Sequence, residues 1–167
     1  GTDAIMLSGE SANGDWPVES VQTMARIATE TEEQLKYETA VSKAKSHTPA
    51  ISGVISRAAC NAANELKAAA IVSSTKSGAT ARRISQCRPD CPIVAVTPCE
   101  KVAKSLAFCI GVYPVVAEDQ NSTDAMMANA TKIAVENGFA NSGDTVVIAA
   151  GLDQVGSTNL LKVSVVE

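Results

Sequence analysis

Two polar loops carry the residues best suited to binding an anion. The first reads Thr75-Lys76-Ser77-Gly78-Ala79-Thr80 and lies between an apolar run and a helix-like pattern. Hydroxyls, a lysine, a glycine and the N–H groups that open a helix are the parts of a phosphate site. Serine and threonine also cap helices in proteins of every class. On spacing alone, phosphate binding and simple helix capping therefore both stay open.

The second polar loop reads Gly151-Leu152-Asp153-Gln154-Val155-Gly156-Ser157-Thr158-Asn159 and follows another apolar run. Gly156, Ser157 and Thr158 could close over an anion that the first loop holds. Taken alone, this loop is better explained as a hairpin connection. The two loops support one site only if both lie at the same edge of a sheet, because ligands bind beyond the carboxyl ends of parallel strands.

No complete catalytic set can be recognised elsewhere. His47 is the only histidine and lies in a polar connector, where we expect it to be solvated. Asp3, Glu10 and Asp15 form a loose acidic group, and helix capping by Asp15 is its simpler explanation. The five cysteines include no C-x-x-C pair, so we expect free thiols rather than a metal site or a disulfide framework. They are Cys60, Cys87, Cys91, Cys99 and Cys109.

Composition narrows the class of protein. The 167 residues are 46% apolar and 19% charged, with a net charge of −4, as in ordinary globular proteins. No basic stripe interleaved with aromatic residues is present, so nucleic-acid binding is not expected. No apolar run is long enough to span a membrane. We therefore expect a cytoplasmic protein that binds neither nucleic acid nor membrane.

Strands and helices must alternate to position the two loops. Apolar runs predict strands, and apolar repeats at three or four residues predict helices. The predicted strands are 70–72, 93–96, 112–116, 145–150 and 160–166. The predicted helices include one with an apolar face formed by Ile51, Val54, Ile55, Ala58, Ala62 and Leu66.

This order predicts an α/β fold: a three-layer sandwich around a mostly parallel five-stranded sheet. The loop at 151–159 is too short for a helical crossover, so the last strand should be antiparallel to its predecessor. Pro114 places the third strand at a sheet edge or at a strand end. Before residue 38, Ala4-Ile5-Met6-Leu7 predicts a short buried strand, then a loop, and Pro17 opens a helix.

The longest run of specific residues resembles the pyruvate kinase family. It reads Gly1-Thr2-Asp3-Ala4-Ile5-Met6-Leu7-Ser8-Gly9-Glu10-Ser11-Ala12, then Gly14, then Trp16-Pro17-Val18-Glu19-Ser20-Val21. In that family this segment is the eighth strand and helix of the (β/α)8 barrel. Three later segments also resemble the family: Thr75 to Gly78, Gly143 to Val147, and Gly151 with Gly156 to Asn159.

The resemblance implies a domain division and a parent activity. Residues 1–37 would be the N-terminal remnant of the barrel, and residues 38–167 the C-terminal regulatory domain. The family transfers a phosphoryl group from phosphoenolpyruvate to ADP with Mg²⁺ and K⁺. The family's catalytic lysine and metal carboxylates lie earlier in the barrel than the segment matched here. We therefore expect the 167 residues of this chain to be inactive alone and to hold no metal or cofactor. Only Ser8 and Glu10 would border the parent active site.

The resemblance also implies partners: the rest of the kinase chain, a tetramer in the parent, and a phosphorylated effector on the loop at 75–80. Asp153 and Gln154 stand where effector-responsive members often carry a basic residue, and Ala79 replaces a longer polar or basic side chain. A second phosphate would meet the carboxylate of Asp153, and repulsion between the two negative charges would oppose its binding. We therefore expect a mono-phosphate ligand, or weak effector control, rather than tight bisphosphate binding.

Two alternatives remain on the sequence. One is a stand-alone sugar-phosphate-binding module of the sugar-isomerase type, whose phosphate loop reads Ser-x-Ser-Gly-x-Thr before a helix, which Thr75 to Thr80 nearly match. The other is an oligomerisation domain without a ligand, in which the loops only cap helices.

Overall fold

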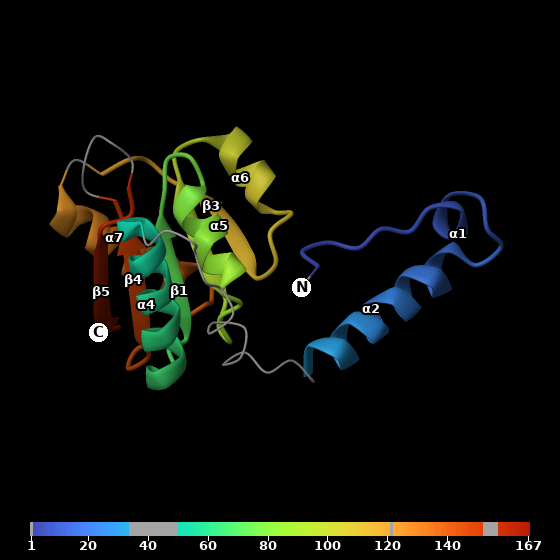
Figure 1. Ribbon diagram of the computed structural model, residues 1–167, viewed down its shortest axis with the longest axis horizontal. Coiled ribbons are helices and arrows are strands. Elements are labelled where there is room, and N and C mark those ends of the chain that lie inside the picture. The colour runs from blue at the N-terminus through green and yellow to red at the C-terminus, as the bar shows by residue number, and fades with distance from the viewer. Residues whose placement is uncertain (1, 34–49, 121, 152–156) are drawn as a thin grey trace. The chain divides into compact units, whose positions relative to one another are not determined.

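A computed structural model describes residues 2–33, 50–120, 122–151 and 157–167 of the chain (Figure 1). The chain divides into two compact units, Gly1–Lys36 and Tyr37–Glu167. The domain boundary expected at 37/38 and the connector that holds His47 lie outside the described residues.

The N-terminal unit consists of two helices, α1 (Gly9–Ala12) and α2 (Pro17–Glu33). Pro17 is the first residue of α2, as expected, because its missing N–H would have no partner there. The predicted strand at 4–7 is wrong: the segment has no regular structure, and Met6 is 84% exposed. A strand needs a neighbour to pair its backbone groups, and no strand among the described residues pairs with this one. The predicted loop after it is also wrong in part, because α1 begins at Gly9.

The second unit is built on a five-stranded sheet with the order β3-β2-β1-β4-β5. The four parallel strands are β1 (Ala70–Ser74), β2 (Ile93–Thr97), β3 (Val112–Val116) and β4 (Thr145–Ala150). Strand β5 (Leu160–Val165) pairs antiparallel with β4, as its short connection predicts. Strand β3 lies at an edge, which agrees with the expectation for Pro114, since a proline cannot donate to a ladder.

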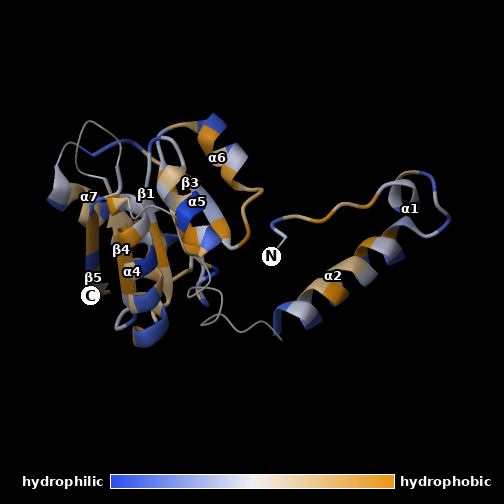
Figure 2. Ribbon diagram, viewed as in Figure 1, coloured by the Kyte–Doolittle hydropathy of each residue, from blue (hydrophilic) through white to orange (hydrophobic). Residues whose placement is uncertain are grey.

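Helices cover both faces of this sheet, so the predicted three-layer sandwich is confirmed. One face packs against α4 (Ile51–Leu66), α5 (Ala79–Gln86) and α6 (Glu100–Leu106). The other face packs against α7 (Thr123–Glu136). The strands are the most apolar part of the unit (Figure 2), and alternate residues of each strand supply the two cores.

Helix α4 forms where the sequence predicts it, but its apolar stripe is not the side that the sheet buries. Ile51 is 66% exposed, Val54 45% and Leu66 50%. The buried side carries small residues instead: Ser52, Ser56, Ala59, Cys60 and Ala63. Small side chains let a helix approach a sheet closely, and the buried Ser56 hydroxyl is satisfied by donating to the Ser52 carbonyl at 2.7 Å.

Helix α7 returns the chain from β3 to β4 across the other face, and its two ends follow the sequence signals. The Ser122 hydroxyl accepts a hydrogen bond from the Ala125 N–H at 3.2 Å. Gly138 follows the helix with φ +75°, the left-handed conformation that glycine adopts without strain. These caps fix the two ends of the helix that covers this face of the sheet.

Candidate functional site

The two polar loops lie at one edge of the sheet because β1 and β4 are adjacent and parallel. The loop after β1 leads into α5, and the loop after β4 leads into β5. A reversal of strand order also falls here, since β1 continues to β2 on one side and β4 lies on the other. Open α/β sheets bind ligands at such a position.

A direct side-chain contact joins the two loops. The hydroxyls of Thr80, in the first turn of α5, and Thr158, just before β5, lie 2.6 Å apart. Both are buried. Gly151 and Ser157 also approach closely, since a Cβ at Gly151 would lie 2.6 Å from the Ser157 carbonyl oxygen. The sequence singled out both threonines but could not show that they touch.

The first loop is shaped by Thr75 and Gly78. The Thr75 hydroxyl accepts a hydrogen bond from the Gly78 N–H at 3.0 Å, and Gly78 has φ +81°. A Cβ at Gly78 would lie 3.2 Å from side-chain atoms of Val102 and Leu106 in α6. Helix α5 therefore opens with a tight turn against α6, and no side chain from Gly78 caps its first amides.

Hydroxyl groups at this edge have protons that no hydrogen bond between described residues uses. Thr75 accepts from Gly78, so its own O–H is still available to donate. Thr80 and Thr158 share one hydrogen bond, so one of their two hydroxyl protons is left over. Lys76 and Ser77 are exposed, and Ala79 adds no polar side chain. Gly156 lies outside the described residues, as do Asp153 and Gln154, whereas Ser157 is described and exposed.

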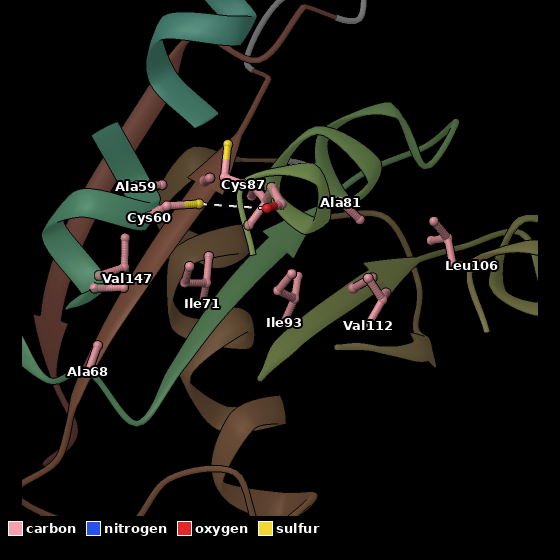
Figure 3. Packing of buried hydrophobic residues seen from close by; sticks show 14 residues of the cluster. Ala59, Cys60, Ala68, Ile71, Ala81, Cys87, Ile93, Leu106, Val112 and Val147 are labelled. Carbon is pink, nitrogen blue, oxygen red and sulfur yellow. Dashed lines mark hydrogen bonds between the residues drawn. The ribbon is translucent and has the colours of Figure 1, made fainter. Parts of the chain in front are cut away.

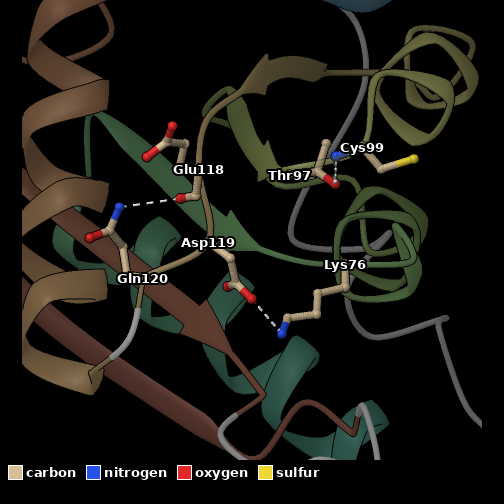
Figure 4. Close-up of polar contacts among 6 residues, drawn as sticks. All are labelled: Lys76, Thr97, Cys99, Glu118, Asp119 and Gln120. Atoms are coloured by element: carbon tan, nitrogen blue, oxygen red, sulfur yellow. Dashed lines mark hydrogen bonds and ion pairs between the residues drawn. The ribbon is translucent and has the colours of Figure 1, made fainter.

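Lys76 is already paired with a carboxylate that the sequence analysis missed. Its Nζ lies 2.5 Å from Oδ2 of Asp119, which follows β3 (Figure 4). Both side chains are largely exposed, at 77% and 52%. Because β3 and β1 are separated by β2, only the strand order brings this aspartate to the loop.

A small pocket lies on the α7 side of the same edge, where Ser74 ends β1 and Val96 stands one residue before the end of β2. Glu118, Asp119, Gln120 and Asn129 supply the rest of its polar lining. The two carboxylates in this lining would repel a phosphate.

One polar group at this edge has no partner. The Ser73 hydroxyl in β1 is fully buried, and among the described residues it is the only buried side-chain oxygen or nitrogen without a hydrogen bond. In the sequence, this unpaired hydroxyl is indicated only by a serine within an otherwise apolar strand.

Ser8 and Glu10 lie in the N-terminal unit. A Glu10 carboxylate oxygen accepts a hydrogen bond from the Ser8 N–H at 2.9 Å. Hydrogen bonds from its own backbone N–H and from Ser8 hold the pKa of Glu10 below its ordinary value. In this structure both residues lie at the start of α1: Ser8 immediately precedes the helix, and Glu10 is in its first turn.

Two absences hold for the described part of the chain. It contains no group of three or more His, Cys, Asp or Glu side chains that could hold a metal ion. None of its helices is long and apolar enough to cross a membrane.

Comparison with known proteins gives one consistent result. The family model described as "Pyruvate kinase, alpha/beta domain" matches residues 53–164. The chain is 48% identical over 170 residues to a pyruvate kinase of Clostridium acetobutylicum, covering 100% of the chain and 36% of that protein. It is 42% identical to a pyruvate kinase of Clostridium perfringens, covering 98% and 35%. The chain thus spans about a third of the length of these relatives.

Solved structures agree with the sequence relatives. A crystal structure of Cryptosporidium parvum pyruvate kinase matches with a TM-score of 0.85 and 29% identity, covering 100% of this chain and 33% of that one. A second pyruvate kinase structure from the same organism matches with a TM-score of 0.87 and 30% identity, covering 100% and 34%.

Proposed function

The chain belongs to the pyruvate kinase family, and we propose that residues 38–167 act as the regulatory and subunit-contact domain of such an enzyme. In the intact enzyme, a phosphoryl group would pass from phosphoenolpyruvate to ADP, with Mg²⁺ and K⁺ supplying charge neutralisation. The family's catalytic lysine and metal carboxylates lie earlier in the barrel, so we propose that this chain carries out no catalytic step by itself. Residues 1–37 would complete the barrel, with Ser8 and Glu10 near its active site.

The observation that carries the regulatory role is the joining of two loops at the strand-order reversal. The Thr80–Thr158 contact closes the β4–β5 loop onto the start of α5. The Thr75 and Thr80 hydroxyls, the Lys76 ammonium and the first amides of α5 all belong to this loop and the helix that follows it. A phosphate group needs that combination of donors and positive charge.

We assign a mono-phosphate ligand to this site, with Gly156 and Ser157 completing its cover. Lys76 is the only cation in the loop at 75–80, and Ala79 contributes no charge. Asp119 already holds Lys76 at 2.5 Å. A second phosphate would therefore add two negative charges without a further cation from this loop, and Asp153 would oppose it.

Calorimetric titration of the chain tests this assignment. We expect a ribose or glucose monophosphate, or AMP, to bind measurably, and fructose bisphosphate to bind no more tightly. Both results are expected because Lys76 supplies the one positive charge in the loop at 75–80, which one phosphate group already uses. Micromolar binding of the bisphosphate without any monophosphate binding would contradict the proposal, and absence of all binding would reduce the loops to helix caps.

Three variants locate the site in that titration. Lys76→Met should weaken monophosphate binding by about ten- to a hundredfold, because a hydrogen bond to a charged group contributes about 1.5–3 kcal/mol. Lys132→Met, on α7, is the matched control and should change nothing. Asp119→Asn should strengthen binding by about two- to fivefold, since an exposed ion pair that competes for Lys76 is worth about 0.2–1 kcal/mol.

Subunit contact is supported by the outward side of α4. Large apolar side chains there face away from the sheet, and Val163 and Val165 are exposed on the edge strand β5. Such a surface is typical of an interface. Sedimentation should therefore show a species larger than one chain at micromolar concentration, and it should shrink when Val54 is replaced by Glu. A monomer at about 100 μM would contradict this role.

A further inference from the structure

Three thiols gather beneath α4 and α5, on the side of the sheet opposite α7. Cys60 lies in α4, Cys87 ends α5, and Cys91 precedes β2. Cys60 is 0% exposed and Cys87 3%, and both belong to one apolar core (Figure 3). The half-buried Cys91 packs against this core. The proposed effector site does not use any of them.

Cys60 and Cys87 meet where α4 packs against the end of α5. The Cys60 thiol and the Cys87 backbone N–H both donate to the Ile84 carbonyl oxygen, at 3.7 Å and 2.9 Å. The Cys87 thiol donates to the neighbouring Arg83 carbonyl at 3.4 Å. In Figure 3 the Cys60 side chain points from α4 toward α5. Both sulfurs are thus held at the same end of α5.

The two thiols are not chemically equivalent. The hydrogen bond to Cys87, together with burial, raises the pKa of Cys60. The hydrogen bond from Cys60 lowers the pKa of Cys87, burial opposes this, and the Arg57 guanidinium lowers it further. Burial raises the pKa of Cys91 to about 11. Because the thiolate is the reactive form, Cys87 is the nucleophile of the group and Cys60 its neighbour.

We propose that Cys60 and Cys87 form a reversible disulfide when the protein meets hydrogen peroxide, linking α4 covalently to the end of α5. The Cys87 thiolate attacks one peroxide oxygen, the O–O bond breaks, and sulfenic acid and hydroxide form. The Cys60 sulfur, giving up its proton, then attacks the Cys87 sulfur, the S–O bond breaks, and the oxygen leaves as water. Two thiols are oxidised and one peroxide becomes two waters. A dithiol reverses the reaction by exchange.

The other cysteines lack this arrangement. Cys99 is exposed and has no thiol beside it, while Cys109 accepts a hydrogen bond from the Arg82 guanidinium at 3.4 Å. Cys91 is held as a thiol by its raised pKa. The Cys60–Cys87 bond also closes a chain loop between two elements that pack together, so it should stabilise the fold rather than strain it.

Peptide mapping of the unmutated chain tests the proposal. After mild hydrogen peroxide treatment and alkylation, mass spectrometry should find the Cys60 and Cys87 peptides joined, with two hydrogens lost. The melting temperature should rise by roughly 5–10 °C and return on addition of dithiothreitol. Oxidation confined to Cys99 or Cys109, with Cys60 and Cys87 still alkylated after unfolding, would overturn the proposal.

Matched variants complete the test. Cys99→Ser should keep the cross-link and the rise in melting temperature. Cys87→Ser and Cys60→Ser should each lose both. A cross-link that persists in Cys60→Ser would show that Cys87 pairs with another thiol, and it would overturn the assignment of partners. Because the peptide map uses the unmutated chain, the result holds even if a serine variant fails to fold.

Discussion

Replacing Ile71 with alanine should lower the free energy of unfolding of the α/β unit by about 3–4 kcal/mol. Ile71 lies in β1, the central strand, is 0% exposed, and packs in the core beneath α4 and α5 (Figure 3). Removing its outer carbons leaves a cavity that neighbours on three strands cannot fill. Urea denaturation followed by circular dichroism measures the change.

The matched control is Ile51→Ala, which deletes the same atoms from a side chain that is 66% exposed on α4. It should change stability by less than about 0.5 kcal/mol at a dilution where the chain sediments as a single copy. If both variants lost the same stability, α4 would bury its apolar stripe after all, and the described packing of that helix would be incorrect.

Replacing Gly78 with alanine should cost about 2–3 kcal/mol and abolish monophosphate binding. The left-handed φ of +81° costs an alanine about 1–2 kcal/mol. Its Cβ would also stand 3.2 Å from Val102 and Leu106, so α6 would have to yield. The turn that opens α5 would then shift, and Lys76 and Thr80 with it. Denaturation and calorimetry report the two effects separately.

Gly138→Ala separates backbone strain from crowding. Gly138 has a similar φ of +75°, but an added Cβ would meet nothing within 4 Å. It should lose only the strain energy of about 1 kcal/mol and keep ligand binding. Equal losses in the two variants would mean that α6 relaxes freely, and retained binding in Gly78→Ala would show that the loop geometry does not position the ligand.

Much of the fold was predictable because its signals are local. Apolar runs broken by polar turns locate all five strands of the sheet. Pro114 indicates an edge strand because it lacks a backbone donor, and the short loop at 151–159 requires an antiparallel return. The segment at 4–7 shows the limit of such signals. It has the composition of a strand, but a strand is formed by its neighbours, and no described strand pairs with it.

Helix α4 shows a second limit. Its apolar period correctly predicts a helix, but the period identifies a stripe and not the surface that the stripe contacts. The sheet instead receives the side with Ser56, Ala59 and Cys60, because small residues allow the closest approach. Only the packing of the whole unit decides which side of the helix is buried.

By itself, then, the sequence determined the family, the order of the elements and the loop at 75–80, since each depends on neighbouring residues. The tertiary structure alone decided which distant residues meet. It brings Asp119 to Lys76, Thr158 to Thr80 and Cys87 to Cys60. These pairings depend on strand order and helix packing, which place residues far apart in the chain within hydrogen-bonding distance, and no local pattern records them.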